Sequence, residues 1–346
     1  MEVLSTVRHP ARDDRSVVEL DMVGEISVDG DGVDITLLFP GRRDPLAEYL
    51  AGSTRAAVIR AFGPDVKVNV RSEVRQAKPA KKGLDLDSSR VEKIRHIIGI
   101  VSGKGGVGKS TVAVNLAVAL SRLGLRTGLA DADVYGPSVP TMTGTEGLTP
   151  LSRSEDGREW IMPIEKYGVK WMSIGYFAER GQALIWRGPM ACNALKQMIL
   201  QVDWGELDYL LIDMPPGTGD IHISLVQDIP MEGAIIVTTP QNVALADVEK
   251  GVNMLRNDSV RKPIFGLVEN MAWFTPAEHP DEKYFIFGRD GGSRMANEFG
   301  LDLLGQIPLV QGIRQSGDDG EPVALGSAPD ALSFLEMARK LCQKLG

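Results

Sequence analysis

The sequence predicts an α/β chain in which a doubly wound, mostly parallel sheet follows a small α+β domain. Beyond residue 93, apolar runs recur without polar alternation, as is typical of strands buried on both faces of a parallel sheet. Segments with apolar residues at helical spacing separate them, and this alternation indicates one doubly wound domain. The runs are 96–102, 127–131, 169–175, 208–215, 233–240, 264–270 and 302–308, and the main helical segments are 110–124, 189–202 and 244–258.

The first 70 residues have the pattern of a separate small α+β domain. Alternating runs within 17–40 are split by Asp-Gly-Asp-Gly, which predicts a β-hairpin. Helical spacing over 44–62 predicts a helix, and 66–70 predicts a third strand. Residues 71–93 are polar, lack periodicity and predict a flexible linker. The expected domains are therefore 1–70 and 94–346, joined by that linker.

Composition and charge exclude several classes of protein. The 346 residues are 43% hydrophobic and 24% charged, as in ordinary globular proteins. No run approaches the ~18 apolar residues of a membrane span, and the N-terminus lacks the apolar core of a signal peptide. We therefore expect a cytoplasmic protein without membrane contact. The net charge of −8 argues against a nucleic-acid partner.

A glycine-rich loop links the run 96–102 to the helical segment 110–124. It matches G-x-x-x-x-G-K-[ST], the phosphate-binding pattern, in the strand–loop–helix context that the pattern requires. Glycines let backbone N–H groups surround phosphate oxygens, and the helix N-terminus adds favourable partial charge. Lys109 is expected to contact the β- and γ-phosphates of ATP and Ser110 to bind Mg²⁺. The expected ATP-binding residues are Gly103, Lys104, Gly105, Gly106, Val107, Gly108, Lys109, Ser110 and Thr111.

Acidic residues at the ends of two predicted strands are expected to complete this site. One strand ends in Asp131 and Asp133, which are placed to orient the attacking water or the hydration shell of Mg²⁺. Asp213 ends another strand and is expected to hold a Mg²⁺-bound water. The turn after it brings the amide of Gly217 toward the γ-phosphate. An ordinary loop cap is the alternative for Asp131 and Asp133.

Recognition of the adenine base is assigned to Asn270, at the end of the run 264–270, with Asn242 as the second candidate. Asparagine is also common in turns and helix caps, so a structural role for both residues is the open alternative.

The phosphate loop resembles the deviant Walker motif of the MinD, ParA and nitrogenase-iron-protein group of ATPases, because Lys104 directly follows its first glycine. In that group the corresponding lysine reaches across a homodimer to the partner's nucleotide. The resemblance implies this role for Lys104, a homodimeric active unit, and a water-positioning role for Asp133. It gives Lys104, Lys109, Asp133 and Asp213 as catalytic residues, with Ser110, Asp131 and Asp213 around the metal. A solvated loop lysine is the alternative for Lys104.

Four further blocks lie between residues 95 and 320: DADVYGPSVPTM, WRGPM (186–190), YLLIDMPPGTGDIHISL and TTPQNVALADVEKGVNM. In these blocks the chain is similar to the Mrp-type iron–sulfur cluster carrier ATPases. The first 70 residues resemble the SufT-like domain that often precedes them. The resemblance implies ATP hydrolysis coupled to cluster assembly or transfer, with client apoproteins or assembly factors as partners.

The sequence departs from this family where many members carry cluster ligands. They have a C-x-x-C pair shortly after the motif ENM-x-x-F, and a dimer pools two pairs around a bridging [4Fe–4S] cluster. Residues 275–288 hold no cysteine. Glu278, His279 and Asp281 lie there, but one histidine among prolines and acids is more typical of a solvated loop than of a cluster site.

The two cysteines of the chain, Cys192 and Cys342, exclude a disulfide framework and cannot complete a four-cysteine site in one chain. Both fit small buried side chains, and two Cys192 thiolates meeting in a dimer are the remaining hypothesis for ligands. An ATP-gated dimeric switch like MinD or ParA, which recruits partners without a cluster, is the alternative function.

Overall fold

The computed structural model describes residues 3–10, 15–20, 22–30, 32–39, 46–74, 88–155, 157–177, 188–276, 278–279 and 281–346. The chain divides into two compact units, Met1–Leu84 and Asp85–Gly346. Four parts of the predictions lie outside the described residues: the hairpin-turn residue Asp31, the start of the first helix at 44–45, most of the linker (75–87), and Trp186 and Arg187 of the WRGPM block.

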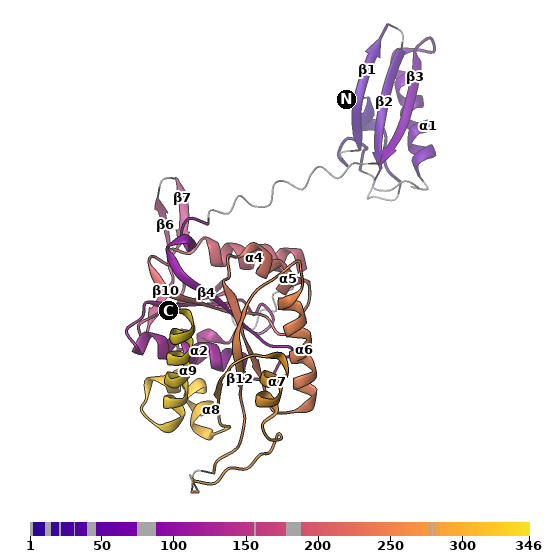
Figure 1. Ribbon diagram of the computed structural model, residues 1–346. Helices are drawn as coiled ribbons and strands as arrows, with labels where there is room; N and C mark the ends of the chain where they lie inside the picture. Colours follow the sequence, from indigo (N-terminus) through magenta and orange to yellow (C-terminus); the bar gives the residue numbers. More distant parts are fainter. Residues whose placement is uncertain are drawn as a thin grey trace. The chain divides into compact units, whose positions relative to one another are not determined.

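The first unit is a three-stranded sheet with one long helix (Figure 1). β1 (Val23–Asp29) and β2 (Gly32–Phe39) form the predicted antiparallel hairpin, and β3 (Lys67–Val74) pairs parallel to β2. Parallel neighbours need a crossover, which α1 (Ala47–Phe62) supplies. A short 3-10 helix, η1 (Leu4–Thr6), precedes them.

This unit has its own hydrophobic core. Alternation along β2 buries every second side chain, including Leu37 and Phe39. They cluster with Leu50 and Val58 of α1. The unit therefore buries apolar surface without help from the rest of the chain.

Within the described residues of the second unit, eight strands form one sheet in the order β13-β12-β11-β4-β10-β5-β9-β8. Neighbouring strands are parallel except for β8 and β9. The strands of the sheet are β4 (Ile94–Val101), β5 (Thr127–Asp131), β8 (Ile164–Lys166), β9 (Val169–Ser173), β10 (Leu207–Asp213), β11 (Gly233–Thr238), β12 (Ile264–Glu269) and β13 (Leu303–Gln306), and β6 (Ser152–Glu155) and β7 (Arg158–Ile161) form a separate hairpin.

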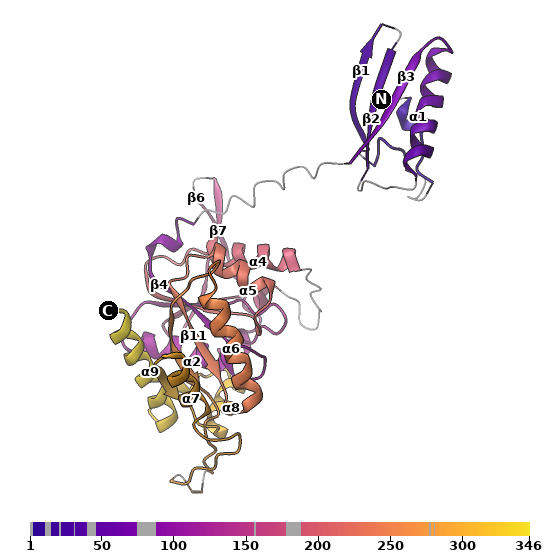
Figure 2. The same cartoon turned by 45° about the vertical axis from the view of Figure 1, so that its right-hand side comes forward.

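Helices cover both faces of this sheet, which confirms the doubly wound, mostly parallel prediction. Figure 2 shows α2 and α9 on one side of the strands and α4, α5 and α6 on the other. The helices are α2 (Lys109–Arg122), α3 (Val139–Met142), α4 (Gly188–Leu200), α5 (Asp220–Asp228), α6 (Asn242–Arg256), α7 (Gly291–Phe299), α8 (Gln311–Asp318) and α9 (Pro329–Leu345), with 3-10 helices η2 (Val91–Lys93), η3 (Ile174–Phe177) and η4 (Val323–Leu325).

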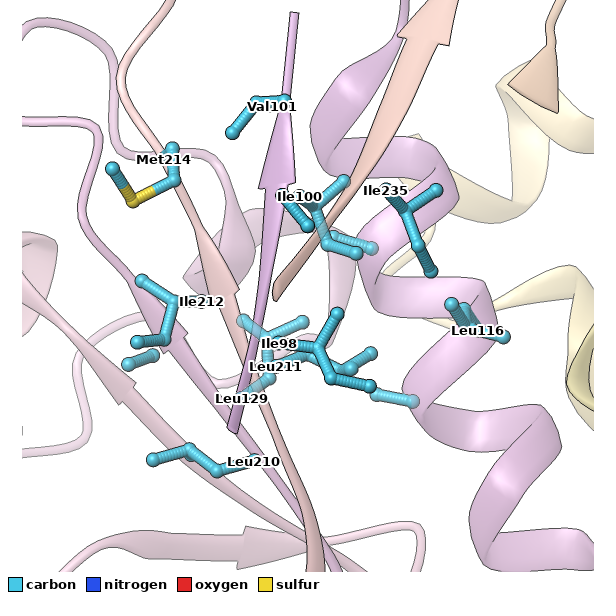
Figure 3. Close-up of a cluster of buried hydrophobic side chains, with 14 of the residues drawn as sticks. Ile98, Ile100, Val101, Leu116, Leu129, Leu210, Leu211, Ile212, Met214 and Ile235 are labelled. Carbon is cyan, nitrogen blue, oxygen red and sulfur yellow. The ribbon is translucent and has the colours of Figure 1, made fainter. Parts of the chain in front are cut away.

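The central strands are buried on both faces, which explains their continuous apolar runs. Figure 3 shows Ile98, Ile100 and Ile235 on the side of the sheet that faces Leu116 of α2. Leu210, Ile212 and Met214 lie on the other side (Figure 3). All of these side chains are fully buried. Packing on both faces holds the carboxyl ends of β4 and β10 in place, and the candidate site is built on those ends.

The structure differs from the sequence-based expectation at short or exposed elements. β3 extends to Val74, so residues 71–74 belong to a strand and not to the linker. The strand expected at 169–175 ends at Ser173, where η3 begins. β6 and β8 have no counterpart in the prediction, because their few, mostly exposed residues carry no apolar run.

Candidate nucleotide-binding site

The phosphate loop, residues 103–108, joins the carboxyl end of β4 to the first turn of α2. β10 pairs with both β4 and β5, with Asp213 opposite Asp131, so three strand ends meet at this edge of the sheet. A cavity of about 190 Å³ lies over the loop. Its lining consists of Ser102, Lys104 through Thr111, Asp133, Ser138, Met142 and Pro216.

Glycine is required at two positions of the loop. Gly108 has a φ of 78°, in the left-handed region that favours glycine, and a Cβ there would lie 2.2 Å from Nδ2 of Asn270. A Cβ on Gly103 would lie 2.2 Å from the backbone oxygen of Asp247 in α6. The loop is therefore closely packed by neighbouring elements, which fixes the direction of its backbone N–H groups.

Lys109 and Asp213 form an ion pair in the interior, between Nζ and Oδ1. Their side chains are 5% and 0% exposed. Burial raises the pKa of Asp213 above its ordinary value, and the charge of Lys109 opposes this rise. Oδ2 of Asp213 is buried and has no hydrogen-bond partner among the described residues. An unpaired buried carboxylate oxygen beside the Ser110 hydroxyl fits a water of the Mg²⁺ shell, so the residues present suit the predicted metal.

Asp131 is fully buried and holds the loop that follows β5. Its Oδ2 accepts hydrogen bonds from the Ser173 hydroxyl at 2.9 Å and from the backbone N–H of Val139 at 3.2 Å. Burial, and after it the charge of Asp213, raises the pKa of Asp131 to about 7. Ser173 was not singled out by the sequence, because a serine in a strand carries no signal of this contact. These hydrogen bonds give Asp131 a structural role beside its predicted role near the metal.

Asp133 and Lys104 both line the cavity. Oδ1 of Asp133 accepts hydrogen bonds from the N–H groups of Tyr135 and Gly136, each at 3.2 Å. These bonds match the loop-cap alternative, while its place on the cavity matches the water-positioning prediction. Lys104 is half-buried, and its ammonium makes no hydrogen bond or ion pair with the residues that the structure describes.

Asn270 lies beside the loop and donates a hydrogen bond from Nδ2 to the backbone oxygen of Val107 at 2.8 Å. This contact gives it the structural role that was the open alternative, and its role in base recognition stays a prediction. Asn242 is exposed at the first turn of α6.

The segment after Asp213 touches the phosphate loop. The amide N–H of Gly217 donates to the backbone oxygen of Ser102 at 3.1 Å, and Gly217 has a φ of 96° that favours glycine. His222 accompanies this segment: its Nε2 lies 2.6 Å from the backbone oxygen of Pro215. A lone histidine in a helix carries no sequence signal, so His222 was missed.

The structure does not bring candidate cluster ligands together. Within the described parts of the chain, no three His, Cys, Asp or Glu side chains are grouped closely enough to hold a metal ion. His279 is exposed and lies 3.7 Å from Glu282. Cys192 is buried in α4, and Cys342 is half-buried in α9. None of the described helices is long and apolar enough to cross a membrane.

Family models match both units. The model described as NUBPL iron-transfer P-loop NTPase matches residues 93–345. The model described as iron–sulfur cluster assembly protein matches residues 1–70.

Curated relatives carry names that agree with these models. The iron–sulfur cluster carrier protein of Synechocystis sp. is 42% identical over 336 residues, which cover 96% of this chain and 93% of the relative. The iron–sulfur cluster transfer protein NUBPL of Mus musculus is 44% identical over 259 residues, which cover 74% of this chain and 79% of the relative.

Solved structures share the fold. The nucleotide-binding protein of Archaeoglobus fulgidus in complex with ADP is 34% identical with a TM-score of 0.61, over 71% of this chain and 94% of that one. The MinD cell division protein of Aquifex aeolicus is 23% identical with a TM-score of 0.51, over 72% and 97%, which shows the fold alone. The resemblance stated from the sequence is thereby confirmed: the chain belongs to the NUBPL-type iron-transfer P-loop NTPases, with an iron–sulfur cluster assembly domain at its N-terminus.

Proposed function

We propose that this chain hydrolyses ATP and uses the nucleotide cycle to transfer iron–sulfur clusters to client apoproteins. The observation that carries the proposal is the buried Lys109–Asp213 pair at the base of the phosphate loop, with Oδ2 of Asp213 unpartnered. Removing two charges from water costs free energy, so a buried ion pair is weak evidence for a stabilising role. Buried, perturbed ionisable groups cluster at functional sites. The names of the relatives supply the cargo, iron–sulfur clusters.

Each residue at the cavity has a separate role in ATP binding and hydrolysis in this proposal. The N–H groups of the loop hold the phosphates, and Lys109 leaves Asp213 to contact the β- and γ-phosphates. Ser110 would ligate Mg²⁺, and Asp213 would hold one of the waters of the ion. When bound, the ion neutralises the charge that develops on the phosphate oxygens. Asp133 orients a water for in-line attack on the γ-phosphorus, and the bond to the bridging oxygen breaks to give ADP and phosphate.

Lys104 supports a homodimer as the active unit. Lys104 lines the cavity, and its ammonium has no acceptor among the described residues of its own chain. A lysine of this kind is free to reach the phosphates of a nucleotide on a second copy, as the family resemblance implies. We propose that ATP-bound copies pair through this contact and separate after hydrolysis.

The cluster is cargo in this proposal, and the chain provides few ligands for it. Iron–sulfur clusters are held by cysteine thiolates, and this chain has two cysteines. A single copy therefore cannot complete the coordination, and transient binding with ligands from a client or an assembly factor fits the composition. The two Cys192 thiolates of a dimer remain a hypothesis for part of the coordination.

An ATP-gated switch without a cluster is the second candidate. The observation that favours it is the cysteine-free segment 275–288 together with the burial of Cys192, which is 8% exposed. Such a switch would recruit partners by dimerisation alone and bind no metal beyond Mg²⁺.

One preparation separates the two functions. Purified chain is reconstituted anaerobically with iron and sulfide and desalted, and bound iron, visible absorption and Mg-ATP turnover are measured. Lys109-dependent turnover with cluster iron supports the carrier, and turnover without cluster iron supports the switch. Absence of turnover at saturating Mg-ATP contradicts both.

A further inference from the structure

We propose that His222 is a positioning residue for ATP hydrolysis, which fixes the peptide that sets the direction of the Gly217 amide. The inference rests on the proposed ATPase function. It concerns the turn Met214–Gly217, which follows Asp213 and carries the predicted γ-phosphate contact.

His222 lies in the first turn of α5 and is 3% exposed. Its Nε2 is 2.6 Å from the backbone oxygen of Pro215. A carbonyl oxygen only accepts, so Nε2 carries the proton and donates it to this bond. Nδ1 then bears the lone pair, and it is buried without a hydrogen-bond partner among the described residues.

The neutral imidazole is the form that the site favours. Burial lowers the pKa of His222, the bond to Pro215 opposes this effect, and the positive charge of Lys109 lowers the pKa further. A neutral ring with its proton on Nε2 holds the Pro215 carbonyl without adding positive charge beside Lys109.

This bond restricts the path from Pro215 to Gly217. It fixes the plane of the peptide between Pro215 and Pro216, and the ring of Pro216 fixes the φ of that residue. The direction of the Gly217 N–H then depends mainly on one dihedral angle, the ψ of Pro216. In the structure this N–H donates to the backbone oxygen of Ser102 at 3.1 Å. In the proposal, rotation about that single angle releases the N–H from Ser102 for the γ-phosphate. His222 thus reduces the freedom of the amide to one rotation.

The helix that carries His222, α5, is packed against its neighbours. Leu225 and Val226 bury α5 in the core, and Asp228 at its end forms an ion pair with Lys196 of α4. Because this packing holds α5 in place, the hydrogen bond from His222 restrains the turn Met214–Gly217 relative to the helix.

The test compares two substitutions at one position. His222→Gln keeps an N–H donor at similar reach, whereas His222→Leu keeps the apolar bulk and removes the donor. We expect His222→Leu to lower kcat about tenfold, with KM for Mg-ATP within about twofold, because the bond orders the turn and not the bound ground state. We expect His222→Gln to retain kcat within about threefold. Wild-type kcat in His222→Leu, or an equal loss in both variants, overturns the proposal.

A matched control removes a buried histidine elsewhere. His96 is 7% exposed, and its Nδ1 lies 2.7 Å from Glu232, before the start of β11 and away from the phosphate loop. His96→Leu is expected to lower thermal stability but to leave kcat unchanged. An equal loss of kcat in His96→Leu and His222→Leu assigns the effect to folding and overturns the proposal.

A spectroscopic readout tests the bond without turnover. The chain has four histidines, so ¹⁵N-histidine spectra of the wild type and of His222→Gln assign the resonance of His222. We expect a neutral ring whose proton on Nε2 exchanges slowly with water, as a buried hydrogen-bonded proton does, and a proton on Nδ1 alone or a freely exchanging proton on Nε2 contradicts the proposal. If the wild type does not hydrolyse ATP, the proposed function fails, while this spectrum still decides whether the bond to Pro215 exists.

Discussion

The phosphate loop and the segment 274–288 belong to the same unit, but they hold their polar side chains in opposite ways. At the loop, Lys109 and Asp213 are 5% and 0% exposed and bonded to each other. In the segment, Tyr284 is 49% exposed, and His279 and Lys283 are exposed as well. A buried pair tolerates little change, because loss of one partner leaves an uncompensated charge, whereas exposed side chains are replaced at small cost. The buried pair therefore restricts substitution at the phosphate loop, whereas the exposed segment tolerates substitution.

The largest effect is expected from removing the buried ammonium. Lys109→Ala should lower Mg-ATP turnover at least about a hundredfold, because the charge that neutralises the phosphates is lost. Phosphate release at saturating Mg-ATP measures it. Lys283→Ala, in the exposed segment, is the matched control and should keep wild-type turnover. Similar turnover in the wild type, Lys109→Ala and Lys283→Ala would show that the loop is not the site of hydrolysis.

Glycines provide a comparison of packing between the two regions. Gly108 and Gly288 both have positive φ, of 78° and 104°. An added Cβ lies 2.2 Å from Asn270 at Gly108 but 3.4 Å from Pro240 at Gly288. Gly108→Ala should therefore lower the free energy of unfolding by about 2 kcal/mol more than Gly288→Ala. Urea unfolding of both variants measures the difference, and equal losses would mean that the loop is not closely packed.

Lys104 should matter for turnover more than for binding. Lys104→Ala should lower kcat about tenfold while the affinity of the monomer for ADP stays within about twofold, because in the proposed dimer the lysine acts on the partner's nucleotide. Calorimetric ADP titration and phosphate release provide the two values. An equal loss of ADP affinity would mean that Lys104 contacts the nucleotide bound to its own chain. Lys104 would then no longer support a dimer.

The smallest effect concerns pH. Because the pKa of Asp131 is raised from 3.8 to about 7 in the folded chain, its contribution to stability is present below pH 3.8 and is lost as pH rises toward 7. The free energy of unfolding of the nucleotide-free chain should fall by about 1 kcal/mol between pH 6 and pH 7. Asp131→Asn should flatten this dependence, and Asp281→Asn, in the exposed segment, should not. Identical pH profiles in the wild type and both variants would contradict the claim that burial raises the pKa of Asp131.

The sequence predicted the strand–loop–helix at the phosphate loop because that pattern is local. It also placed Asp131 and Asp213 at strand ends, where register in the sheet brings them opposite each other. It did not predict that Asn270 holds the loop or that Ser173 bonds Asp131, because these contacts join residues far apart in the chain. His222 was missed for another reason: its partner Pro215 is near in the chain, but a lone histidine in a helix carries no sequence signal of this contact.

The account is tested most directly by transfer of a cluster to an apoprotein that requires one. The anaerobically reconstituted chain is mixed with such a client, and recovered client activity is followed with and without Mg-ATP, for the wild type and for Lys109→Ala. The account predicts that the wild type transfers faster with Mg-ATP and that Lys109→Ala does not respond to it. Transfer at the same rate in every condition, or no transfer beside normal ATP turnover, would contradict it.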